Sequence, residues 1–429
     1  MSTAPSRRHF LRGLAAGSLG LAVTRPAHGA AAGTRAAPAL RATPAAPDER
    51  FWEEVKAQFP LREGIIPMNA ANLCPAPLSV IEAQVAAMRD VDGDVSSQNR
   101  ATYDRLREAV REAVATDLGV TGDEVALVRN TSEANNIVVA GLPLGAGDEV
   151  VVFDQNHATN NVAWDVRAKR HGFTVRRVTL PDALSDPAQA LAAFRGAFTP
   201  RTRVLAFSDV SNVSGVRLPV EALGAAAHAV GAHVHVDGAQ TWGVRRIDLA
   251  TYGCDSYAAS AHKWLCGPKE IGLLYVRRER IPAIWPGVVG VGWGPRAETD
   301  AVGARKFETL GQRDDSATAA LAAALAFRAR LGPEHIEARV GELAAAVREG
   351  LAALPDARLV TPRDAALNAG VVIARIDGAD PRRLIQRLYA DHGIAGAATG
   401  GLRLCPHIYN TMADVDRARA ALRDALRAA

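Results

Sequence analysis

Lysine and cysteine, two of the reactive residue types, are scarce in this 429-residue chain. Lys and Arg together number 50, yet lysine occurs only at positions 56, 169, 263, 269 and 306. Chemistry that needs a primary amine therefore has few candidates. The cysteines show no C-x-x-C or other metal-ligand spacing, which argues against a zinc site or any other metal site, and their spacing names no disulfide pair. They are Cys74, Cys254, Cys266 and Cys405.

The chain also lacks a strong charge of either sign. The formal net charge is +4, and no basic tract is interleaved with aromatic residues. The sequence therefore predicts no nucleic-acid partner. A hydrophobic content of 48% is typical of a globular protein, and the length allows two or three modest domains without a 20–50-residue repeat.

The N-terminal residues resemble a targeting signal rather than part of a folded domain. Arg7 and Arg8 precede a mild apolar run, residues 14–23, which is too short for a membrane span of about 20 residues. A stretch of small residues follows, so residues 1–32 resemble a twin-arginine export signal. The alternative is a basic disordered tail. We predict a periplasmic or otherwise exported protein with no membrane insertion after processing, and an Ala/Pro-rich linker over residues 33–48.

Strand-like and helix-like segments alternate along the rest of the chain, which favours an α/β sheet covered on both faces. We expect a large domain over residues 49–310, a linking helix over 311–335 and a smaller C-terminal domain over 336–429. The expected strands of the large domain are 125–129, 149–153, 174–178, 204–207, 233–236, 256–259 and 272–276. An early helix, 77–89, has Ile81, Val85 and Met88 on one face.

The motif Ser260-Ala261-His262-Lys263 follows one of these strands, and Asp237 ends the strand before it. A lysine amine forms a Schiff base with the aldehyde of pyridoxal 5′-phosphate. An aspartate paired with the pyridinium nitrogen keeps that ring protonated, so it acts as an electron sink. An unpaired carboxylate at the end of an apolar strand is costly to bury. The sequence therefore predicts a pyridoxal phosphate site, although Asp237 could also cap a turn.

Several polar residues can hold the cofactor's phosphate and ring. Thr131 and Ser132 lie at a strand-to-helix turn, where free N–H groups favour a phosphate, though the same residues form an ordinary helix cap. Ser260 and His262 can donate to the same phosphate. An aromatic ring at His157 can stack on the pyridine, or cap the next helix. Asn212 and Gln240 can reach the phenolic oxygen, although the cluster around Asn212 is also ordinary turn chemistry.

Arg403 lies within an apolar strand and needs an anion there. Its guanidinium fits the α-carboxylate of a substrate, while the alternative is a structural salt bridge.

Taken together, these motifs resemble the class V aminotransferase family of fold-type I pyridoxal phosphate enzymes, which includes cysteine desulfurases and isopenicillin N epimerases. The resemblance runs from about residue 65 to the C-terminus. It implies a mostly parallel seven-stranded sheet plus a smaller C-terminal α+β domain. It also implies a homodimer in which Gln312 lends a phosphate contact to the neighbouring subunit.

The resemblance implies that Lys263, Asp237 and His157 are the catalytic residues, as Schiff-base lysine, ring-nitrogen partner and stacking residue. Thr131, Ser132, Ser260 and His262 would then hold the phosphate, Asn212 and Gln240 would lie near the phenolic oxygen, and Arg403 would bind a small amino-acid substrate.

Two departures from the family pattern narrow the activity. The stretch 391–398 lacks the nucleophilic cysteine of the desulfurases, and Cys405 lies beyond Arg403. An export signal also argues against a housekeeping biosynthetic role. We expect transamination first, epimerisation or racemisation second and β-elimination third, with a non-catalytic cofactor-binding protein as the remaining alternative.

Overall fold

A seven-stranded sheet forms the centre of the computed structural model, which describes residues 38–181, 184–291, 293–298 and 302–427. The predicted export signal lies outside these ranges. The strand order is β2-β8-β7-β6-β5-β3-β4, and every neighbouring pair from β7 to β4 is parallel. Only β8 runs antiparallel to its neighbours. The strands are β2(Val125–Val128), β3(Glu149–Phe153), β4(Thr174–Val178), β5(Thr202–Ser208), β6(His233–Asp237), β7(Ser256–Ser260) and β8(Gly272–Val276).

Helices cover both faces of this sheet, because its central strands are apolar on both sides. One face packs against α4(Ser97–Asp117), α7(Pro187–Ala197), α8(Val220–His228) and α10(Asp315–Leu331). The other face packs against α5(Thr131–Gly141) and α6(Ala158–His171). The predicted two-layered cover is confirmed.

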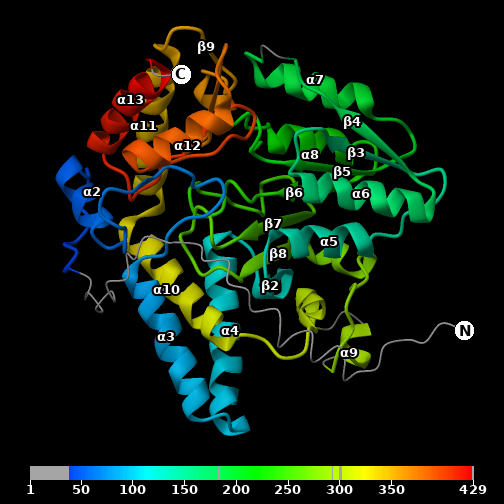
Figure 1. Cartoon of the computed structure of the whole chain (residues 1–429). Coiled ribbons are helices and arrows are strands. Elements are labelled where there is room, and N and C mark those ends of the chain that lie inside the picture. The colour runs from blue at the N-terminus through cyan, green and yellow to red at the C-terminus, as the bar shows by residue number, and fades with distance from the viewer. Residues whose placement is uncertain (1–37, 182–183, 292, 299–301, 428–429) are drawn as a thin grey trace, which may run out of the picture. The chain divides into compact units, whose positions relative to one another are not determined.

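A second, smaller layer follows α10 in the chain (Figure 1). Its antiparallel sheet has the order β12-β10-β9 and is packed by three helices around a separate apolar core. The elements are α11(Pro333–Ala352), β9(Ala357–Leu359), β10(Val372–Ile376), α12(Pro381–His392), β12(Leu402–Leu404) and α13(Met412–Arg427). Short strands β1(Ile66–Pro67) and β11(Ile394–Ala395) pair in parallel, which joins the segment before α3(Leu78–Gly93) to the smaller layer. The fold class predicted from the sequence is confirmed.

The apolar face expected on the early helix is not part of the core. Helix α3(Leu78–Gly93) lies beside α10, with Val80 and Ala87 buried (Figure 1). Ile81, Val85 and Met88 are exposed instead, at 37%, 38% and 49%. The pattern therefore predicted the helix correctly, but no described residue buries this face. No helix of the described ranges has the length and hydropathy to cross a bilayer.

Candidate active site

The carboxyl ends of β5, β6 and β7 meet the start of α5 at one cavity of about 240 Å³. Because these strands are parallel, the residues that follow them lie at the same edge of the sheet. The cavity gathers nine of the ten predicted cofactor residues. They are Thr131, Ser132, His157, Asn212, Asp237, Gln240, Ser260, His262 and Lys263.

Lys263 and Asp237 are the two charged groups at the centre of this cavity. Asp237 ends β6 and is 4% exposed. Its carboxylate accepts bonds from Asn135 Nδ2 at 2.8 Å and from the Ala239 amide at 3.1 Å. Burial lowers the pKa of Lys263 below its usual 10.5, Asp237 opposes this shift, and Arg403 adds to it. A lowered pKa favours the neutral amine that imine chemistry requires.

A buried chain of hydrogen bonds, from His235 through Asn135 to Asp237, positions the Asp237 carboxylate. Its middle residue, Asn135, was not predicted from the sequence. His235 Nε2 lies 2.9 Å from Asn135 Oδ1, and its Nδ1 lies 2.8 Å from Ser256 Oγ. Burial lowers the pKa of His235 to about 3, so the ring is neutral. A neutral ring that donates from Nε2 orients the Asn135 amide, so its N–H points at Asp237. The signal for Asn135 was its position four residues after Thr131, one turn into a helix that opens on the cavity.

The start of α5 offers the predicted anion site. Asn130 caps the helix by accepting from the Glu133 amide at 3.0 Å, so the cap interpretation is also correct. Ser260 Oγ accepts from the Thr131 amide at 2.7 Å and lies 2.6 Å from Thr131 Oγ1. This contact ties the end of β7 to the helix start, where free N–H groups and the helix dipole favour a phosphate.

His262 and His157 lie on two sides of this anion site. The Nδ1 atom of His262 donates to the Lys269 carbonyl at 3.1 Å. Burial, followed by the Lys263 charge, lowers the pKa of His262 to about 4. His157 caps α6 through Nδ1, which lies 2.8 Å from Thr159 Oγ1. Desolvation, followed by Lys263, also lowers the pKa of His157. His157 therefore both caps a helix and lines the cavity.

The side-chain amide of Gln240 is held by the segment 69–72 and the lysine loop, whereas Asn212 contacts Arg403 through its backbone carbonyl. Gln240 donates to the Ala71 carbonyl at 3.0 Å and accepts from Trp264 Nε1 at 2.7 Å. One N–H of its amide remains for the cavity. The Asn212 carbonyl accepts from Arg403 Nη1 at 2.9 Å. Asn72 also lines the cavity and was not predicted.

Arg403 is buried beside the cavity, 4% exposed, within β12. Its Nη2 donates to Asn69 Oδ1 at 3.0 Å, and its Nε has no hydrogen-bond partner among the residues that the structure describes. The salt bridges of the described residues include none from Arg403, so the structural ion pair offered as an alternative is absent there. A buried guanidinium without an anion is costly, and a ligand carboxylate would neutralise it.

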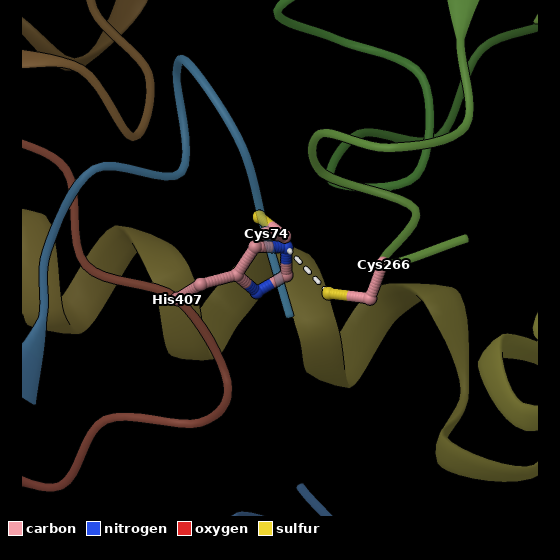
Figure 2. Close-up of side chains that lie close together, drawn as sticks. All are labelled: Cys74, Cys266 and His407. Atoms are coloured by element: carbon pink, nitrogen blue, oxygen red, sulfur yellow. Dashed lines mark hydrogen bonds between the residues drawn. The ribbon is translucent and has the colours of Figure 1, made fainter. Parts of the chain in front are cut away.

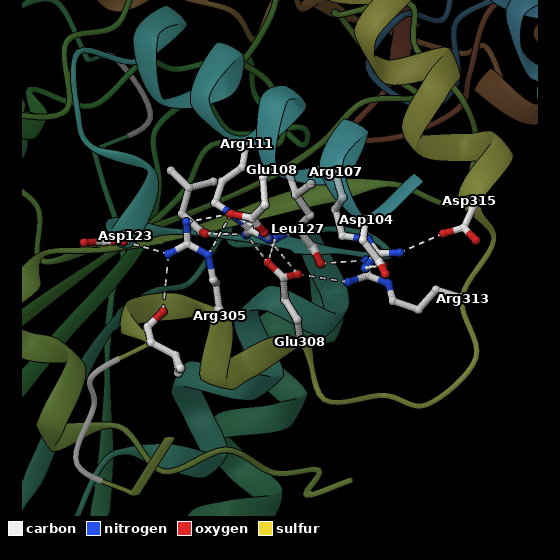
Figure 3. Close-up of polar contacts among 12 residues, drawn as sticks. Asp104, Arg107, Glu108, Arg111, Asp123, Leu127, Arg305, Glu308, Arg313 and Asp315 are labelled. Carbon is white, nitrogen blue, oxygen red and sulfur yellow. Dashed lines mark hydrogen bonds and ion pairs between the residues drawn. The ribbon is translucent and has the colours of Figure 1, made fainter. Parts of the chain in front are cut away.

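Gln312 does not join the cavity of its own chain. It lies in a turn at a separate surface hollow, where its amide donates to the Arg313 carbonyl at 3.3 Å. The buried Arg111–Glu308 pair and its neighbours fasten this turn to β2 (Figure 3). The position is compatible with the predicted loan to a neighbouring subunit, which stays a prediction.

The donor set fits pyridoxal phosphate on three observations. The Lys263 amine, whose pKa is lowered, lies near the buried Asp237 carboxylate, and a hydrogen bond from Asn135 fixes that carboxylate in place. A helix start with two hydroxyls closes one end of the cavity. A buried guanidinium with an orphaned Nε lies beside the cavity and is suited to a carboxylate.

Comparison with known proteins agrees with this geometry. The family model described as aminotransferase class V matches residues 69–426. The chain belongs to the aminotransferase class V family. Isopenicillin N epimerase from Streptomyces clavuligerus is 33% identical over 391 residues, which cover 87% of this chain and 98% of the epimerase.

Solved structures share the fold. A variant of C-DES with glycine covalently linked to its pyridoxal phosphate cofactor superposes with a TM-score of 0.80 at 24% identity, over 88% of this chain and 100% of that one. A cysteine desulfurase from Escherichia coli gives 0.77 at 27% identity, over 88% and 98%. The predicted class V resemblance and the fold-type I architecture are both confirmed.

Proposed function

We propose that this class V protein uses pyridoxal 5′-phosphate to move the Cα proton of a small α-amino acid. The observation that carries the proposal is Arg403, a buried cation without a carboxylate partner beside the Lys263 amine. Pyridoxal phosphate is the cofactor of the chain, and when bound it supplies an electron sink for negative charge at the substrate Cα.

Three residues of the chain, Arg403, Lys263 and Asp237, bind the substrate and hold the protons. Arg403 binds the substrate carboxylate with two parallel N–H donors, which fixes Cα relative to Lys263. Lys263 accepts the Cα proton on its neutral amine, since burial has lowered its pKa. Asp237 holds a proton on the ring nitrogen, with Asn135 and the Ala239 amide fixing the carboxylate.

The place where the proton returns decides the reaction. With the cofactor bound, return of the proton to the opposite face of Cα would invert the amino acid, whereas failure to return it to Cα would lead to a keto acid. Epimerisation is favoured by the 33% identical epimerase, which matches this chain over 98% of its own length. Transamination, the first expectation from the sequence, stays a prediction. Sulfur transfer is disfavoured because residues 391–398 contain no cysteine.

Proton exchange in deuterated water tests the proposal. Purified holoenzyme is incubated with single-enantiomer amino acids, and Cα deuterium, the opposite enantiomer and keto acid are measured. Deuterium at Cα with inversion supports epimerisation, and stoichiometric keto acid supports transamination. Lys263→Ala should abolish all three signals.

A borohydride experiment separates loss of the reaction from loss of the cofactor. Borohydride should fix the cofactor mass on the peptide that contains Lys263. If the label is there but no amino acid exchanges its Cα proton, the amino-acid assignment fails and a cofactor-binding protein without this activity remains. Label on Lys269 would overturn the lysine assignment itself.

A further inference from the structure

Two cysteines that the proposed reaction does not use, Cys74 and Cys266, lie together beside His407 (Figure 2). Cys74 belongs to the segment after β1, and Cys266 lies three residues beyond Lys263. Both side chains are 1% exposed. Their sulfur atoms and Nε2 of His407 lie within 4.8 Å of one another, and the Cys266 sulfur lies 3.8 Å from Nε2.

This cluster has the residue types of a metal site, but both ring nitrogens of the histidine are hydrogen-bonded to backbone groups. His407 Nδ1 accepts from the Ile408 amide at 2.7 Å. Nε2 lies 2.8 Å from the Trp264 carbonyl, which can only accept, so Nε2 carries the hydrogen. A ligating histidine presents a lone pair to the metal and donates its other N–H to a neighbour. Here Nδ1 already accepts from a backbone amide and Nε2 donates to a carbonyl, so His407 offers no lone pair to a metal and the two thiols are left as the reactive groups.

The backbone at Cys266 is a second, independent observation. Its φ is +56°, one of two positive values for non-glycine residues in the described part of the chain. A residue with a Cβ reaches this conformation at a cost in free energy. The Cys266 amide donates to the Lys263 carbonyl at 2.9 Å, so this strained turn directly follows the lysine.

We propose that Cys74 and Cys266 form an oxidation site in which a peroxide converts the thiol pair into a disulfide. The Cys74 sulfur attacks hydrogen peroxide as a thiolate and becomes a sulfenic acid, and the hydroxide that it releases takes up a proton and leaves as water. The second thiol attacks that sulfur, the S–S bond forms and a second water leaves. The two thiols lose two hydrogens and two electrons in total, and the peroxide is reduced to two waters.

The disulfide would act on the cavity through the backbone. The Cys74 amide donates to the His262 carbonyl at 2.8 Å, and Lys269 Nζ lies 3.4 Å from the Cys74 carbonyl. Bonded sulfurs lie about 2.05 Å apart, so the two side chains must move together when the bond forms, and this movement pulls on the loops that carry them. Those loops carry Lys263 and Asn72, which both line the cavity. Oxidation should therefore change the environment of the lysine reversibly.

Mass spectrometry of the holoenzyme tests the site directly. Holoenzyme treated with hydrogen peroxide is alkylated without reductant and digested. We expect a cross-linked Cys74–Cys266 peptide lacking two hydrogens, with restoration of both thiols by dithiothreitol. Cys74→Ala and Cys266→Gly should each abolish this cross-linked peptide. Glycine is chosen at position 266 because it adopts the positive φ there without strain, whereas serine would keep the strain. Cys254→Ser, in a different buried cluster, should leave it intact.

A second readout follows the cofactor's visible band, which should shift on oxidation and return on reduction in the wild type but not in Cys74→Ala. Three results would overturn the proposal. The first is alkylation of both thiols after a treatment that oxidises methionine elsewhere. The second is a disulfide that uses Cys405 instead. The third is stoichiometric zinc or copper in the purified protein that Cys266→Gly removes, because the cluster would then be a metal site.

Discussion

Arg403 is the residue on which the substrate assignment depends. Its guanidinium is oriented by the Asn212 carbonyl and Asn69 Oδ1, so only part of it remains for a ligand. Arg403→Lys keeps the charge but loses the planar two-donor geometry. Apparent affinity for α-amino acids should fall by about 1.5–3 kcal/mol, the value of a charge-assisted hydrogen bond. Titration of the holoenzyme's visible spectrum measures this.

The matched control for Arg403→Lys is a primary amine without a carboxylate, whose binding should hardly change. Equal loss for both ligands would mean that Arg403 only supports the fold around Asn69 and Asn212.

Lys263 provides a pH test that needs no turnover. Its folded-state pKa is lowered, so between that value and 10.5 the folded apoprotein binds fewer protons than the unfolded chain. Stability therefore rises with pH through this window, and the cost of the buried ammonium is greatest below the lowered pKa. Lys263→Met should stabilise the apoprotein at about pH 7 and give little gain near pH 10. Thermal unfolding at both pH values checks this.

Lys169→Met, at an exposed site on α6, is the control and should show no such trend. A gain for Lys263→Met that is equal at both pH values would indicate a packing effect instead.

At the scale of elements, the turn before α10 is held to the sheet by one buried ion pair (Figure 3). Arg111 of α4 is 1% exposed and contacts Glu308, which ends the 3-10 helix η3(Gly303–Glu308). Glu308 also accepts from the Leu127 amide of β2 at 2.6 Å. The contacts of Glu308 therefore join η3 to α4 and β2, which lie 197 and 181 residues earlier in the chain at the contact points.

Glu308→Gln should lower the free energy of unfolding by up to about 3 kcal/mol, because the buried Arg111 then keeps only the partly exposed Glu108, at 2.9 Å, as its counter-charge. Urea unfolding of the holoenzyme measures the loss. Asp165→Asn breaks the exposed Arg177 pair and should change stability by less than about 1 kcal/mol. Similar losses for the two variants would contradict a special role for the buried pair.

At the scale of the whole molecule, the uncovered apolar face of α3 favours the predicted homodimer. Ile81, Val85 and Met88 share one stripe of that helix and are all exposed. We expect sedimentation at twice the chain mass of 45.2 kDa and a shift toward the monomer for Met88→Asp. Val230→Asp, at an apolar site equally exposed outside this stripe, is the control. A dimer unaffected by Met88→Asp would place the interface elsewhere.

Export remains a proposal that rests on Arg7 and Arg8. A reporter fused to residues 1–35 should cross the inner membrane by the twin-arginine route, and changing both arginines to lysine should stop it. Transport of the double-lysine version at the normal rate would remove the inference.

The sequence by itself determined the cofactor, the fold class and most of the elements. Scarce lysine left Lys263 conspicuous, and strand periodicity located β3, β4 and β8 at their observed bounds. These signals are local, because a motif and a two-residue period need only neighbouring positions. Local patterns also placed Asp237 at the end of β6, so its role in the cavity followed from parallel strands ending at one edge.

The tertiary structure alone decided which distant groups share an environment. The contact of His235 with Asn135 and the meeting of Cys74 with Cys266 each join residues about 100 or more positions apart. The burial of Arg403, whose Nε has no partner among the described residues, was likewise visible only in the folded structure. The tertiary structure also decided that the apolar stripe of α3 stays exposed and that Gln312 lies outside its own cavity. The physical reason is that burial and pairing depend on how elements pack, which no local period encodes.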